Sequence, residues 1–181
     1  KEQLGIRILN ISVGACSKRG MSENSALVKG VNRAWDAGLV VVVAAGNNGP
    51  RTMSITTPGI SRKVITVGCS DDDREVLVGG NRMVDYSGRG PTAACICKPD
   101  LVAPGCSVVS CSSRADKYTI KSGTSMSTPI VSGAVALLLE RFPDMSNKDV
   151  KLRLRESSVD IGLPRNQQGW GLLDVGKMLE R

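Results

Sequence analysis

The sequence predicts an α/β fold, a mostly parallel sheet flanked by helices. Strand-like apolar segments alternate with segments of helical periodicity along the 181 residues. Residues 39–45 form an unbroken apolar run rich in valine, which is typical of a strand covered on both faces. No repeat and no long linker divides the chain, so we expect residues 1–181 to belong to one domain.

The first half of the chain predicts a βαβ unit. Residues 6–13 are apolar at alternate positions, which indicates a strand. Residues 23–37 carry Leu27, Val31 and Trp35 at helical spacing, and Gly38 is a typical helix stop. The strand at 39–45 follows, so the two strands should run parallel and be joined by a right-handed crossover.

Shorter elements are expected in the middle of the chain. Residues 63–68 predict a third strand, and residues 84–87 and 107–110 predict two shorter ones. Glycine and proline predict loops at residues 88–91, at 99 and at 104–105.

The C-terminal third predicts three helices. The first runs from Ser125 to about Arg141 and is apolar on nearly every side, which favours a central, buried position. Pro129 is expected in its first turn, where a missing N–H costs nothing, and Pro143 ends the helix. Residues 147–157 predict an amphipathic helix and residues 174–179 a short terminal one.

Composition and charge exclude several classes of partner. The chain is 41% hydrophobic and 23% charged, which is ordinary for a globular protein. Its net charge of +7 is scattered and is not interleaved with aromatic residues, so we predict no nucleic-acid partner. No apolar run approaches the roughly 20 residues of a membrane span, so we predict no membrane partner.

The six cysteines favour free thiols over a metal site. Cys95 and Cys97 are the only close pair, and one residue between them is not the spacing of a zinc ribbon. Disulfides remain an alternative because the count is even. The remaining cysteines are Cys16, Cys69, Cys106 and Cys111.

Candidate catalytic residues follow the predicted strands. Ser12 ends the first strand and Asn47 follows the second, so both should lie at the carboxyl-end rim where parallel sheets bind ligands. Ser125 would join them at a helix N-terminus, where free N–H groups favour negative charge. The backbone N–H of Ser125 and the amide of Asn47 would then form an oxyanion hole. Asn47, which precedes Asn48 and Gly49, fits plain turn chemistry as well.

Six segments occur in a family order. In one-letter code they are NISVG at 10–14, VAAGNNG at 43–49, YSGRGP at 86–91, KPDLVAPG at 98–105, GTSMSTP at 123–129 and GWGLLD at 169–174. Together they resemble the subtilisin-like serine proteases over essentially the whole chain. The resemblance implies a subtilisin-like three-layer fold that here lacks its N-terminal strands.

The resemblance also implies roles for single residues. Ser125 would be the acylating nucleophile and Asn47 the side-chain oxyanion donor. A substrate strand that pairs with the peptide backbone would be formed by Ser12, Val13 and Gly14. The pocket for the side chain before the scissile bond would be lined by Ala45, Gly46 and Thr56. Many relatives have a smaller residue at the last of these positions, so we expect a shallow pocket.

The chain contains no histidine, so Ser125 lacks the imidazole that would activate it. In the family, the catalytic aspartate and histidine lie on an N-terminal segment of roughly a hundred residues, and this chain added to it would reach a usual domain length. That segment and its strands are absent. We therefore expect the C-terminal portion of a catalytic domain, inactive alone.

Other bases and another function stay open. Lys121 lies four residues before Ser125, although a flexible surface lysine is the default. Sedolisins use glutamate and aspartate without histidine, but they place an aspartate where Asn47 stands.

The first function is a serine endopeptidase that cleaves protein or peptide substrates through an acyl-enzyme on Ser125. The second is a non-catalytic peptide-binding or scaffold module, which would need neither Ser125 nor Asn47.

The resemblance implies no required cofactor. Some relatives bind a weak calcium or sodium ion at the loop between Gly59 and Val64, which makes that loop a candidate cation site. Relatives are mostly secreted, whereas the cysteines slightly favour a cytoplasmic location, so the compartment stays open.

Overall fold

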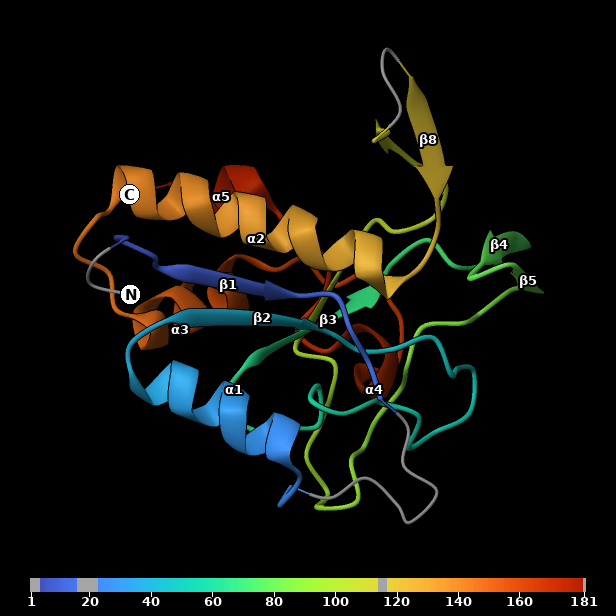
Figure 1. Ribbon diagram of the computed structural model, residues 1–181, viewed down its shortest axis with the longest axis horizontal. Helices are drawn as coiled ribbons and strands as arrows, with labels where there is room; N and C mark the ends of the chain where they lie inside the picture. Colours follow the sequence, from blue (N-terminus) through green and yellow to red (C-terminus); the bar gives the residue numbers. More distant parts are fainter. Residues whose placement is uncertain (1–3, 16–22, 114–116, 181) are drawn as a thin grey trace.

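The computed structural model of the protein describes residues 4–15, 23–113 and 117–180. The main sheet has four parallel strands in the order β1-β2-β3-β6 (Figure 1). The strands span Ile8–Ile11, Val40–Ala44, Ile65–Cys69 and Leu101–Ala103. Helices α1 (Ala26–Asp36) and α2 (Thr124–Arg141) lie on opposite sides of this sheet (Figure 1). The α/β class with a parallel sheet flanked by helices is therefore confirmed.

The predicted βαβ unit is present. β1 and β2 pair in parallel, with Ile8 opposite Val40, and every residue of β2 is buried. α1 begins after Ser25, whose hydroxyl accepts a hydrogen bond from the Val28 N–H at 3.3 Å. The helix is shorter than residues 23–37 because this serine caps it, two residues after the predicted start.

α2 packs across the main sheet and contacts all four of its strands. Its inward side chains, among them Val131, Val135 and Leu138, are buried in the main core. On the outward face Gly133 and Leu137 are exposed among the residues that the structure describes. The expectation that this helix is buried on nearly every side is therefore wrong for one face.

Pro129 is the sixth residue of α2, not part of its first turn. The helix begins at Thr124, after an N-cap glycine, Gly123, with φ 136°. This φ lies in a region that favours glycine. Because Pro129 has no N–H, the carbonyl of Ser125 receives no helical hydrogen bond from it.

Two antiparallel hairpins project beyond the carboxyl ends of the main sheet (Figure 1). One pairs β4 (Val76–Val78) with β5 (Asn81–Met83), and the other pairs β7 (Val108–Cys111) with β8 (Tyr118–Lys121). β7 confirms the strand predicted at 107–110.

The strand predicted at residues 84–87 is wrong. Asp85 has a φ of 50°, which an extended strand does not adopt. The N–H of Ser87 donates to the buried carboxylate of Asp72 at 2.7 Å instead of to a neighbouring strand.

Three further helices follow α2 in the described part of the chain: α3 (Asn147–Ser157), α4 (Arg165–Gln168) and α5 (Val175–Leu179). α3 starts with a capping box, in which Ser146 and Asp149 each bond the other's backbone N–H. In the described ranges no helix is long and apolar enough to cross a membrane.

Candidate active site

Three segments meet where the parallel strands end. Ser12 follows β1, Asn47 follows β2, and Ser125 is the second residue of α2. The fold brings them together because neighbouring parallel strands end at the same rim and α2 begins there.

Thr124 fixes the orientation of the Asn47 side chain. Its backbone N–H and its hydroxyl both donate to Asn47 Oδ1, each at 3.0 Å. The hydroxyl also accepts a hydrogen bond from the Gly46 N–H at 3.2 Å. A backbone N–H can only donate, so the atom that faces it must be the amide oxygen. The Nδ2 end of Asn47, with two donors, lies beside Gly123, the N-cap of α2.

Ser125 lies half-buried in the first turn of α2. Its hydroxyl donates to the backbone carbonyl of Ser12 at 3.1 Å, which links the candidate nucleophile to the predicted substrate strand. Its own N–H has no carbonyl four residues earlier within the helix, and the positive end of the helix dipole lies here. Both features favour negative charge beside Ser125.

A network behind the site holds the start of α2. The N–H of Gly123 donates to the carbonyl of Gly105 at 2.9 Å. Asp71 in turn accepts from the N–H of Gly105 at 2.8 Å and from the thiol of Cys69 at 3.1 Å. Burial raises the pKa of the Cys69 thiol to about 12, so this cysteine is a structural group without nucleophilic character.

The predicted pocket residues also come together. Thr56 is buried, and its N–H and hydroxyl donate to the carbonyl of Ala45 at 2.8 and 3.2 Å. Its side chain lies between Gly14 and Gly46, and a Cβ on either glycine would overlap it. Val13, beside Gly14, is 63% exposed. Thr56 therefore fills the space between the predicted substrate strand and the end of β2.

The sequence pattern does not single out Thr124 as a functional residue. Its position inside the GTSMSTP segment is the only signal, because its partner Asn47 lies 77 residues away. Lys121, the alternative base for Ser125, is exposed on β8. The Ser125 hydroxyl donates to the carbonyl of Ser12 and not to this lysine.

The candidate cation site does not fit a metal ion. The carbonyl of Gly59 accepts a hydrogen bond from the Thr66 hydroxyl at 2.7 Å. The carbonyls of Arg62, Lys63 and Val64 accept from the ammonium of Lys151. Among residues 4–15, 23–113 and 117–180, no cluster of three or more histidine, cysteine or acidic residues could hold a metal.

The described cysteines are free thiols, as the sequence favours: Cys69, Cys95, Cys97, Cys106 and Cys111. Cys16 lies outside the described residues.

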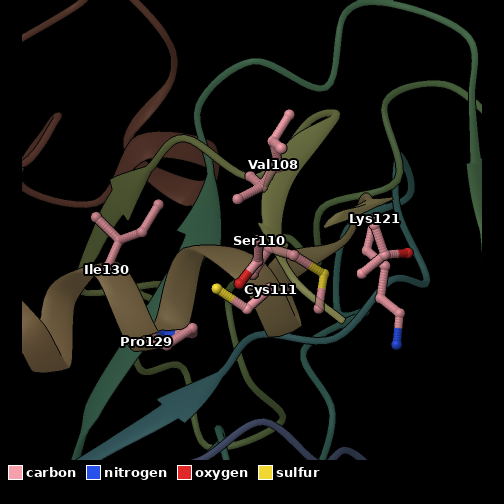
Figure 2. Close-up of a pocket in the computed structure, with 9 residues that line it drawn as sticks. Val108, Ser110, Cys111, Lys121, Pro129 and Ile130 are labelled. Atoms are coloured by element: carbon pink, nitrogen blue, oxygen red, sulfur yellow. The ribbon is translucent and has the colours of Figure 1, made fainter. Parts of the chain in front are cut away.

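A groove of about 400 Å³ separates the β7–β8 hairpin from the first turns of α2, and Figure 2 shows it. Val108, Pro129 and Ile130 give this groove an apolar lining beside the site.

A family model described as "Subtilase family" matches residues 2–171. Serine protease AprX of Bacillus subtilis (strain 168) is 40% identical over 167 residues, which are 84% of this chain and 38% of AprX. Subtilisin DY of Bacillus licheniformis is 34% identical over 175 residues, which are 96% of this chain and 57% of that protein. The chain thus spans less than two thirds of the length of either relative.

Solved structures are similar to this chain as well. Sphericase superimposes with a TM-score of 0.75 at 30% identity, covering 94% of this chain and 57% of Sphericase. The self-cleaved protease domain of PatA gives a TM-score of 0.73 at 26% identity, covering 98% of this chain and 62% of that one.

Proposed function

Because the chain belongs to the subtilase family of serine proteases, we propose that it is the C-terminal part of the catalytic domain of a serine endopeptidase. Ser125 is the nucleophile and Asn47 the side-chain oxyanion donor. The observation that carries the proposal is the pinned Asn47 amide, which Thr124 holds by its oxygen so that Nδ2 can donate beside Ser125.

The proposed reaction is acyl transfer to Ser125. Its Oγ attacks the carbonyl carbon of the scissile peptide bond while a histidine takes the hydroxyl proton. The negative oxygen that forms accepts from Asn47 Nδ2 and the Ser125 N–H. The C–N bond then breaks, the proton passes to the leaving amine, and water hydrolyses the ester on Ser125.

The histidine and its aspartate are proposed to come from an N-terminal segment absent from this chain. Two surfaces support this proposal. β1 is the edge of the main sheet in the described part of the chain, so one side of it can pair with a further strand. The exposed apolar face of α2, which includes Pro129 and Leu137, begins next to Ser125. A segment packed there would reach the nucleophile.

Ser12, Val13 and Gly14 are proposed to bind the substrate backbone as an added strand. Thr56 fills the space between Gly14 and Gly46. We propose that it makes the pocket for the side chain before the scissile bond shallow, so that a small side chain such as alanine is favoured there. Thr56→Gly should raise kcat/KM for leucine relative to alanine at that position by about tenfold. An unchanged ratio would contradict this role of Thr56.

A fluorophosphonate probe tests the proposal, because it labels a serine only where a base activates it. We expect labelling when the N-terminal segment is present, and no labelling of this chain alone or of Ser125→Ala. The absence of labelling with that segment present and folded would favour the non-catalytic peptide-binding or scaffold module.

A further inference from the structure

Two lysines surround the carboxylate of Asp100, which directly precedes β6, and both also contact the carbonyl of Val64. Lys98 Nζ lies 2.5 Å from Asp100 Oδ2 and donates to the carbonyl of Val64 at 3.1 Å. Lys151 Nζ lies 3.6 Å from Asp100 Oδ1. The side chains of Lys98 and Asp100 are only 1% and 8% exposed, so this is a buried ionic cluster.

Lys151 binds a row of backbone oxygens. Its ammonium donates to the carbonyls of Arg62, Lys63 and Val64 at 3.1, 3.0 and 2.9 Å. An ammonium ion carries one positive charge and three donors, so these three acceptors saturate it. Backbone carbonyls converging on one point are the usual ligands of a hard cation such as K⁺ or Ca²⁺.

Aromatic rings complete the surroundings of the Lys151 ammonium. The rings of Trp35 and Trp170 have their centroids 5.7 and 6.0 Å from Nζ. Ring faces at this distance attract a cation. Asp100 Oδ2 also accepts the N–H of Thr66 at 2.7 Å, so every polar group named here has a partner inside the chain.

We infer that the ammonium groups of Lys98 and Lys151 take the place of a bound metal cation, so that residues 62–64 are held without Ca²⁺ or Na⁺. The carbonyls already have donors, and two positive charges repel a third. A metal would have to displace Lys151 to reach them. Removing that ammonium should open a site for a cation between the three carbonyls and Asp100.

Thermal unfolding of the full chain in potassium, calcium and choline chloride at equal ionic strength tests the inference. We expect the Tm of the wild-type chain to be the same in all three salts within about 1 °C. Lys151→Met keeps the apolar stem, and we expect its Tm in choline to fall by about 5 °C. Potassium or calcium should restore part of this loss, whereas choline is too large to enter.

Lys148→Met is the matched control, since it removes one exposed ammonium from the same helix, α3. Its Tm should shift by about 1 °C or less in every salt. A wild-type chain stabilised by potassium or calcium, with the gain lost in Asp100→Asn, would overturn the inference, and this arm does not require the Lys151 variant to fold. A Lys151→Met variant with the wild-type Tm in all three salts would overturn it as well.

Discussion

The cluster around Asp100 and the cluster around Ser125 use polar groups in opposite ways. At Asp100, two ammonium groups and one carboxylate pair with each other and with backbone carbonyls, all inside the chain. At Ser125, Thr124 pins the oxygen of the Asn47 amide, and the Nδ2 end of the amide lies beside Gly123. In a saturated cluster the partners offset the cost of the buried charges, whereas an unsaturated cluster can bind a reacting group.

The largest expected effect is a difference in the free energy of unfolding between a variant of the Asp100 cluster and a variant of the Ser125 cluster. Lys98→Met leaves the buried Asp100 carboxylate short of a partner, so we expect the free energy of unfolding to fall by about 3–5 kcal/mol. Ser125→Ala removes one half-buried hydroxyl and should change it by about 1 kcal/mol or less. Urea unfolding of both variants measures the difference. Equal losses would break the comparison.

The pH dependence of stability sharpens the comparison of the two clusters further. Burial lowers the pKa of Lys98 from 10.5 to about 8. Below pH 8 both folded and unfolded chains hold this proton, so the cost of the buried charge is fully present. Between pH 8 and 10.5 the unfolded chain binds more protons, and stability therefore rises with pH.

The rise attributable to Lys98 is at most about 3 kcal/mol, at 1.36 kcal/mol for each unit of pKa difference. Urea unfolding at about pH 7.5 and about pH 10 should show it in the wild-type chain relative to Lys98→Met. Parallel pH profiles for the two proteins would show that Lys98 does not titrate in this range.

Asn47→Asp tests the Nδ2 end of the amide in the assembled protease. The aspartate keeps an oxygen that accepts from Thr124 but loses the N–H donors. A hydrogen bond to a charged oxygen contributes about 1.5–3 kcal/mol, so kcat should fall by about 10- to 100-fold or more. The Tm should stay within a few degrees, since the pinned oxygen is retained. Full activity would remove Asn47 from the oxyanion hole.

Thr124→Val gives the smallest expected effect. Valine has the shape of threonine without the hydroxyl, so the Gly46 N–H loses its acceptor while the backbone N–H still holds Asn47. We expect kcat to fall by about tenfold with KM nearly unchanged, because Thr124 positions Asn47 without touching substrate. Thr124→Ser should restore most of the rate. A change in KM alone would contradict this role.

Much of the fold could be predicted because long elements carry periodic signals. The valine run of β2 indicates a buried strand, and both ends of α1 lie within three residues of their predicted places. β6 has three residues between Pro99 and Pro104, which is too short for any periodicity. No hairpin was predicted at β4 and β5, because strands of three residues each carry no clear periodicity, although Gly79 and Gly80 between them form a typical two-residue hairpin turn.

The site could be predicted only in part. Motifs locate Ser125 and Asn47 because their residue types and neighbours are specific. The contacts that orient them join positions far apart in the chain, such as Gly46 with Thr124, and no local pattern encodes such a contact. The contact of the Lys151 ammonium with residues 62–64 could not be predicted for the same reason, since 87 residues separate Lys151 from Val64.

The placement of Thr56 between two glycines has a consequence for how this chain can vary. The Thr56 side chain fills the space that a Cβ on Gly14 or on Gly46 would need, because a Cβ on either glycine overlaps it. The effect of a substitution at Gly14 therefore depends on which residue stands at position 56, which is epistasis with a steric cause. Gly46 has a φ of 93° and remains constrained in any background, so Thr56 is the position through which this part of the site can diversify first.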